Sequence, residues 1–126
     1  MMKTRVYKQF EDLVIWKQGV DLCVKLYEEL WDSKHYALKD QITRSAISVP
    51  SNIAEGFERQ SDKEFVKFLY YAKGSSGELR TQLFIANQLA IIEKSVCEEA
   101  IAQSRRISGM IQNLITTIKN DIKKTN

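Results

Sequence analysis

The 126-residue sequence holds few of the residues that turn or break a chain: one proline and five glycines. β-Sandwiches and barrels need frequent turn residues, and α/β folds need strands that alternate with helices. The sequence has neither pattern, so it predicts an all-α chain. Its apolar fraction of 44% is sufficient for the core of one domain.

Residues that commonly carry chemistry are also scarce. The only histidine is His35, in a predicted loop, which argues against a histidine-based triad or a multi-histidine metal site. Cys23 and Cys97 are far apart and are not paired with histidine ligands, so we interpret them as reduced, packed thiols. Gly56 lacks the strand-to-helix setting of a phosphate-binding loop. We therefore expect no metal, no cofactor and no enzymatic activity.

Long hydrophobic runs are absent as well. No stretch of about 18 uncharged apolar residues is present, which is the length that a membrane-spanning helix needs. The N-terminal segment MMKTRVYKQF is positively charged, but no apolar run follows it as in a signal peptide. These absences predict a soluble, cytoplasmic protein without a membrane partner.

What the sequence does contain is helical periodicity of apolar residues. Long amphipathic segments with short connections predict an antiparallel, up-down-up-down four-helix bundle in a single domain over residues 1–126. We place the helices at residues 13–31, 38–58, 62–91 and 96–122.

The starts of three helices carry capping signals. Asp12 is the expected N-cap of the first helix. Ser61 with Glu64, and Ser95 with Glu98, match the capping box that opens the third and fourth helices. The expected buried face of the first helix comprises Leu13, Trp16, Val20, Val24, Tyr27 and Trp31.

The segment from Asp40 to Arg59 carries two parallel stripes and the only proline, Pro50. Because the apolar stripe keeps its phase across the proline, we predict one helix kinked at Pro50 rather than two helices. The apolar stripe comprises Ile42, Ala46, Val49, Ile53 and Phe57. The polar stripe, expected to be partly buried, comprises Gln41, Arg44, Ser48, Asn52, Glu55 and Arg59.

Small residues around Gly74 and Gly77 in the third helix suggest that the second helix approaches closely there. Glu78 then lies level with Arg44, so we predict a buried or half-buried ion pair between them. The resulting polar cluster has a catalytic and a structural interpretation. The structural one is favoured, because side chains normally fill the core of a small bundle. Its members are Arg44, Ser48, Asn52, Glu55 and Glu78.

The net charge of +3 is unevenly distributed, with basic residues concentrated near both chain ends. In an up-down-up-down bundle, both chain ends and the turn between the second and third helices meet at one pole. Such a basic pole could contact nucleic-acid phosphates, or its lysines could serve solubility and the helix dipole. The basic residues placed there are Lys3, Arg5, Lys8, Arg59, Lys63, Lys119, Lys123 and Lys124.

Several segments together match a known family pattern up to Ile92: FEDLVIWK from Phe10, SVPSNIAEG from Ser48, and FLYYAKGSSGEL from Phe68. With these segments the sequence resembles the 23S rRNA intervening sequence proteins, which are encoded within bacterial 23S ribosomal RNA genes. It departs modestly from the pattern, for example at Ala37, where glycine is common, and at Ser76, where an apolar residue is usual.

The resemblance implies a four-helix bundle, a ring-shaped homopentamer and no established enzymatic activity. A related branch, the accessory variability determinant of diversity-generating retroelements, is a basic pentamer that binds nucleic acid and a reverse transcriptase. A pentamer would also account for apolar positions left over after one bundle is packed, namely Val14, Ile47, Tyr70 and Ile91.

Two functions of different classes therefore remain. The protein is either a homo-oligomer that binds RNA or DNA through the basic pole, or a self-assembling scaffold that docks another protein without binding nucleic acid. The salt dependence of binding distinguishes them, because phosphate contacts weaken steeply as salt rises.

Overall fold

A computed structural model of the chain describes residues 7–125. All regular structure within this range is helical, as expected, and it comprises four long helices and one short 3-10 helix, η2. Their bounds are η2 Phe10–Asp12, α1 Val14–Glu29, α2 Tyr36–Phe57, α3 Asp62–Gln88 and α4 Lys94–Thr125.

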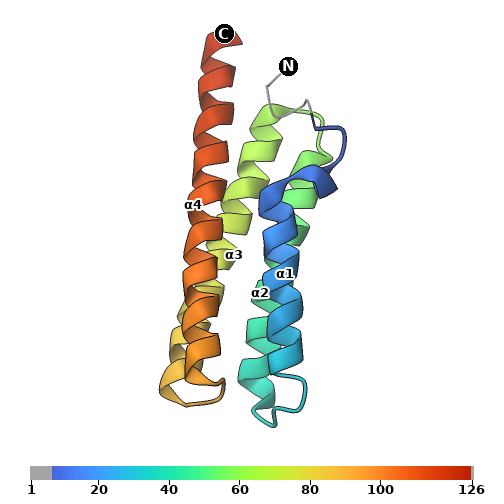
Figure 1. Cartoon of the computed structure of the whole chain (residues 1–126). Helices are drawn as coiled ribbons and strands as arrows, with labels where there is room; N and C mark the ends of the chain where they lie inside the picture. Colours follow the sequence, from blue (N-terminus) through green and yellow to red (C-terminus); the bar gives the residue numbers. More distant parts are fainter. Residues whose placement is uncertain (1–6, 126) are drawn as a thin grey trace.

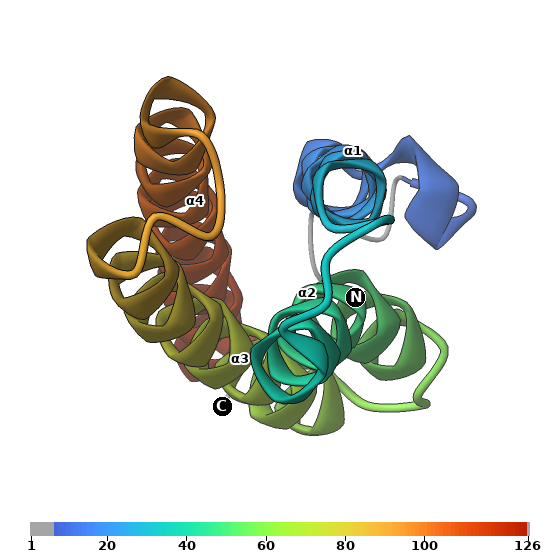
Figure 2. The same cartoon turned by 90° about the horizontal axis from the view of Figure 1, so that it is seen from below.

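The four long helices pack side by side as a four-helix bundle (Figures 1 and 2). Contacts join α1 to α2, α2 to α3, α3 to α4 and, least extensively, α1 to α4. Figure 1 shows the α1–α2 and α3–α4 connections at the lower end and the α2–α3 connection at the upper end. The last turns of α4 rise beyond the α2–α3 connection, whereas α1 begins lower down.

The start of α1 and its buried face both differ from the prediction. Asp12 lies in η2, and Leu13 is the N-cap residue without a side-chain hydrogen bond. Of the predicted face, Leu13 is buried, but Val24 is 50% exposed and Trp31 is 71% exposed. The buried face lies one residue to the side and comprises Ile15, Gly19, Leu22, Cys23, Leu26 and Leu30.

The physical reason is that α1 carries apolar residues around most of its circumference. Both sets of residues recur at steps of three and four, so periodicity alone does not determine which face meets α2. Burying the face with Ile15 leaves the other, with Val24 and Tyr27, at the surface.

Helix α2 is continuous through Pro50, and its apolar stripe is buried as predicted. Gly19 of α1 packs here against the Pro50 ring. The amide of Asn52 donates to the Ser48 carbonyl at 2.9 Å, so it does not reach the carbonyl of Ala46 that the proline leaves without an N–H. The kink itself stays a prediction.

The two cysteine thiols, Cys23 and Cys97, are free and buried, and burial raises the pKa of both.

Helix α3 begins where its capping signal predicts. The Ser61 hydroxyl accepts a hydrogen bond from the Glu64 backbone N–H at 3.1 Å. The helix ends at Gln88 rather than at 91, because Ala90 adopts a positive φ of 54° and the Ile91 N–H bonds back to the Ala86 carbonyl at 3.0 Å. This pattern is the Schellman motif that ends many helices.

Helix α4 is capped by a residue that the sequence analysis missed. The Glu93 carboxylate, immediately before the helix, accepts from the Val96 N–H at 3.1 Å and from the Ser95 hydroxyl. The predicted capping box of Ser95 and Glu98 is therefore wrong, because Ser95 already lies within the helix and donates to Glu93.

We expect Glu93→Ala to lower the melting temperature near neutral pH. Hydrogen bonds from Ser95 and the Val96 N–H lower the pKa of Glu93 from its ordinary value of 4.5. A lowered folded-state pKa stabilises the protein above the unfolded-state value, and this stabilisation is lost as pH falls through the folded-state pKa. The difference between variant and wild type should therefore shrink below pH 4.5. Thermal melts at several pH values test this, with Glu98→Ala as the matched control; an equal loss for Glu98→Ala would restore the capping box.

The glycines of α3 do not mark the close helix approach that was predicted. A Cβ atom built at Gly74 or at Gly77 has no heavy atom within 4 Å. A side chain at either position would thus meet open space. Helix α2 does approach α3 at this level, through the Ser48–Ser75 hydrogen bond of 2.8 Å, and a tight backbone contact occurs at Gly56, where α2 meets the start of α3.

Candidate nucleic-acid interface

The predicted basic pole is formed from helix ends that lie together. The segment entering α1, the α2–α3 connection and the end of α4 share the upper end of the bundle in Figure 1. Of the predicted cations, Lys8, Lys63, Lys119, Lys123 and Lys124 are exposed, and Lys3 and Arg5 lie outside the described residues.

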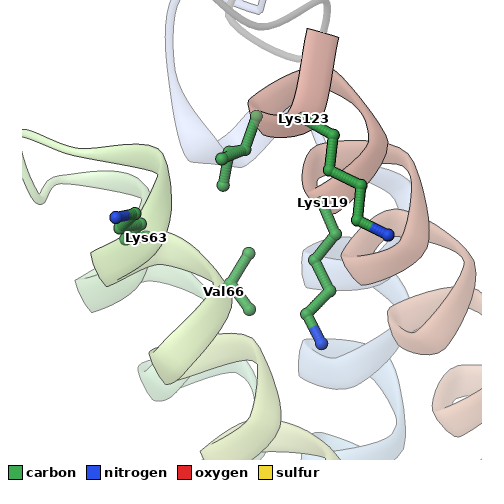
Figure 3. A pocket seen from close by; sticks show the side chains of 5 residues that line it. Lys63, Val66, Lys119 and Lys123 are labelled. Carbon is green, nitrogen blue, oxygen red and sulfur yellow. The ribbon is translucent and has the colours of Figure 1, made fainter. Parts of the chain in front are cut away.

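Three of these lysines surround one pocket of about 350 Å³ between the start of α3 and the end of α4. Figure 3 shows Val66 pointing into the space between the two helices, with Lys63 on one side and Lys119 and Lys123 on the other. In this view the Lys119 side chain runs beside the space, and the nitrogens of Lys63 and Lys123 point away from it on opposite sides. The full lining is Lys63, Val66, Lys119, Ile122 and Lys123.

The pocket is open because the helices differ in length. At a rise of about 1.5 Å per residue, the 16 residues of α1 span about 24 Å and the 32 residues of α4 about 48 Å. Helix α1 therefore leaves the last turns of α4 uncovered, and Ile122 is only half-buried. No carboxylate or imidazole lines the pocket, so its groups can bind an anion but supply no general base.

Tyr70 belongs to this region, although the sequence analysis did not place it there. The Lys119 ammonium donates to the Tyr70 hydroxyl at 3.1 Å and lies 5.3 Å from the ring centroid. Helical spacing in the sequence could have indicated Tyr70, because it follows Val66 by one helical turn and so lies on the same face of α3.

Arg59 is directed elsewhere. Its guanidinium pairs with Glu55 at 3.0 Å and lies 4.7 Å above the Phe68 ring. It lines a separate, more polar pocket with Glu58 and Glu64. The predicted basic pole thus contains one lysine cluster and one arginine beside acidic residues.

The predicted polar network is only partly assembled. Ser48 and Ser75 share a hydroxyl–hydroxyl bond of 2.8 Å between α2 and α3, and the Asn52 amide donates to the Ser48 hydroxyl at 3.0 Å. The Ser45 hydroxyl donates to Glu78 at 2.8 Å. These bonds join α2 to α3.

The predicted ion pair between Arg44 and Glu78 is wrong. Arg44 pairs with Asp40 on its own helix at 2.8 Å, and its side chain is 77% exposed. The hydrogen bond to Asp40 raises the pKa of Arg44. Long, charged side chains of the polar stripe reach solvent, whereas the short ones, Ser48 and Asn52, stay half-buried.

We expect Arg44→Ala to leave the melting temperature unchanged, because an exposed ion pair between adjacent helical turns contributes little. Leu69→Ala, which truncates a fully buried side chain of α3, is the positive control. A drop comparable to that of the control would show that Arg44 takes part in a buried network after all.

Residues 7–125 offer neither a membrane-spanning helix nor a cluster of metal ligands. No helix in this range combines the length and apolar character needed to cross a membrane. The same range has no group of three or more His, Cys, Asp and Glu residues placed to hold a metal ion.

Comparison with known proteins adds a family and a fold. The chain is similar to a protein of unknown function from the S23 ribosomal protein family of Bacteroides thetaiotaomicron, whose crystal structure it matches with a TM-score of 0.77. The match has 24% identity and covers 82% of this chain and all of the other, which shows a shared fold. No curated protein matches the sequence. The sequence pattern of the 23S rRNA-intervening sequence proteins matches residues 11–113, so the chain belongs to the 23S rRNA-intervening sequence protein family.

Proposed function

We propose that the protein is a non-catalytic, cytoplasmic homo-oligomer that binds RNA or DNA through the basic end of an antiparallel bundle. One observation carries the proposal: three lysines from two helices surround a single pocket without a carboxylate. Phosphate groups are the anions that such a cluster matches, and lysine contacts to phosphate supply affinity independent of base sequence.

Oligomerisation would make weak phosphate contacts useful. Several subunits in a ring present the same cluster repeatedly, which raises the effective concentration for a long polyanion. The homopentamer is implied by family resemblance, and the nucleic-acid-binding accessory variability determinant offers an analogy.

An apolar groove between α1 and α2 is the surface we assign to self-association. Its volume is about 350 Å³, and it contains the apolar residues that α1 leaves at the surface. Val24 is 50% exposed and Ile47 is 48% exposed, which is typical of a contact surface rather than of a monomer exterior. The groove is lined by Trp16, Val20, Cys23, Val24, Ile47, Pro50, Ser51 and Ala54.

The test is a fluorescence-anisotropy titration of labelled structured RNA and duplex DNA at low and physiological salt. We expect saturable binding that weakens as salt rises. Replacing Lys119, Lys123 and Lys124 together by Glu should weaken it at least about tenfold, because each contributes a phosphate contact. The matched control reverses three lysines outside the pole: Lys25, Lys34 and Lys94.

Acidic residues in a last helical turn oppose the helix dipole, so a Lys→Gln triple variant checks that any loss of binding does not come from fraying of α4. Absence of binding by the wild-type protein at low salt would eliminate the proposal. An equal loss for the control variant would show that general charge, and not the pole, is responsible.

The second candidate is a self-assembling scaffold without nucleic-acid binding, in which the α1–α2 groove docks another protein instead of mediating self-association. The exposed apolar lining of that groove favours it. Docking on an apolar surface should change little with salt, which separates it from phosphate binding.

A further inference from the structure

Side chains of α3 and α4 meet in consecutive pairs along the outside of their packing interface, which we call the α3–α4 seam. The Lys73 ammonium donates to the Gln112 carbonyl oxygen at 2.6 Å, and the Arg80 guanidinium lies 3.4 Å from the Ser108 hydroxyl. The seam continues to Lys119 beside Tyr70 and, in the opposite direction, to Arg105 beside Phe84.

The seam is basic along its whole length. Its cations are Lys63, Lys73, Arg80, Arg105, Lys119 and Lys123. Within the described residues none of them forms an ion pair, and the arginine pairs with acids involve Arg44, Arg59 and Arg106. Glu98 lies beside the seam, in a pocket of about 210 Å³ with Phe84 and Arg105.

Exposed aromatic rings lie near both ends of the seam. Tyr70 is 42% exposed and Phe84 is 43% exposed, and each ring has a cation beside it. The two residues are 14 positions apart on one helix, which is about 21 Å at 1.5 Å per residue. Between them, Gly77 leaves the surface open, since an added Cβ would meet no atom within 4 Å.

We infer that the α3–α4 seam binds a single strand of nucleic acid, whose phosphates follow the six cations and whose bases stack on Tyr70 and Phe84. This assignment rests on the proposed function and extends it from the basic pole to a defined path and a defined class of nucleic acid. Surfaces that bind single strands combine a basic track with aromatic rings, because every base has a face that can stack.

Charge and geometry favour this occupant over the alternatives. A second copy of the chain would bring a net charge of +3 toward a row of six cations. A duplex keeps its bases paired and stacked, so its phosphates could contact the lysines but its bases could not reach Tyr70 or Phe84.

The experiment compares a labelled 12-nucleotide oligouridylate with a 12-base-pair RNA duplex in anisotropy titrations. We expect the wild-type protein to bind the single strand more tightly. Tyr70→Ala and Phe84→Ala should each weaken that binding about fivefold or more, with no change for the duplex. Tyr36→Ala is the matched control, because Tyr36 is 70% exposed at the start of α2, away from the seam.

A second variant tests the cations between the rings. Replacing Lys73 and Arg80 by Gln should reduce the slope of log affinity against log salt by about 1.4, at roughly 0.7 per phosphate contact of a single strand. The control replaces Lys17 and Lys25 of α1 by Gln and should leave the slope unchanged. Because Arg80 is half-buried, circular dichroism must show that the double variant folds; if it does not, the two exposed aromatic positions carry the test.

The outcomes separate this inference from the proposed function. If the lysine variants at the basic pole lose binding while the seam variants bind like wild type, the proposed function stands and the seam assignment is wrong. Equal affinity for duplex and single strand also overturns the seam assignment. If Tyr70→Ala or Phe84→Ala changes the oligomer mass, the seam is a subunit contact instead. Absence of wild-type binding overturns both.

Discussion

Replacing Phe65 by alanine is expected to lower the free energy of unfolding by about 3–5 kcal/mol, the usual range for truncating a buried phenylalanine. Phe65 is fully buried at the start of α3. Its ring meets Phe57 of α2 edge to face, with centroids 5.8 Å apart, and Phe57 in turn lies 6.5 Å from Phe10. Truncation therefore leaves a cavity where three segments meet and removes one partner of an aromatic pair.

Urea denaturation followed by circular dichroism measures the effect. Because oligomerisation adds to apparent stability, all variants must be compared at one protomer concentration. Tyr71→Ala is the control: Tyr71 lies on the same helix but is 48% exposed. A loss at Phe65 no larger than that at Tyr71 would contradict the packing at this end of the bundle.

Gly56→Ala should lower the free energy of unfolding by about 1–3 kcal/mol, the usual cost of overpacking. An added Cβ would lie 2.6 Å from the Phe68 Cβ and 3.3 Å from the Phe65 carbonyl oxygen. Neither atom can rotate away, because the Phe65 oxygen belongs to the backbone and the Phe68 Cβ is bonded directly to the backbone. The clash thus exceeds the gain of about 1 kcal/mol that alanine has over glycine in a helix.

Gly74→Ala supplies the opposite expectation. A Cβ there meets nothing within 4 Å, so helix propensity alone applies and the variant should be more stable by up to about 1 kcal/mol. In thermal and urea unfolding, the two variants should therefore change the free energy of unfolding in opposite directions. If Gly56→Ala were also stabilising, α2 and α3 would not approach as closely as described.

Much of the fold could be predicted from local patterns. The apolar stripe of α2, from Ile42 to Phe57, is buried, and α3 begins at Ser61 as its capping signal indicated. Both predictions succeed because they depend on neighbouring residues within one helix: the periodicity selects a face, and a serine hydroxyl reaches a backbone N–H three residues later.

The failures have a different origin. Helix α1 offers two apolar faces, and only packing against α2 shows that Ile15 and Leu26 face inward while Val24 does not. Arg44 could pair with Asp40, one turn away on α2, or with Glu78 on α3. It pairs with Asp40 because that ion pair keeps both charges in water. Glu93 caps α4 although Ser95 matched the expected motif.

The candidate site divides in the same way. The sequence indicated which lysines gather at the basic pole, because chain topology alone brings helix ends together. The pocket with Val66 and Ile122, and the pairing of Lys119 with Tyr70, depend on the relative lengths and register of α3 and α4.

The sequence by itself determined the helical class, the number of helices and the residues that supply most of the core, because these follow from composition and from periodicity within a segment. Only the tertiary structure decided which face of α1 is buried, where Arg44 and Glu78 find partners, and that six cations and two aromatic rings line the α3–α4 seam. These features depend on the rotation and axial offset of one helix against another. Many side chains set that arrangement together, so no single local pattern encodes it.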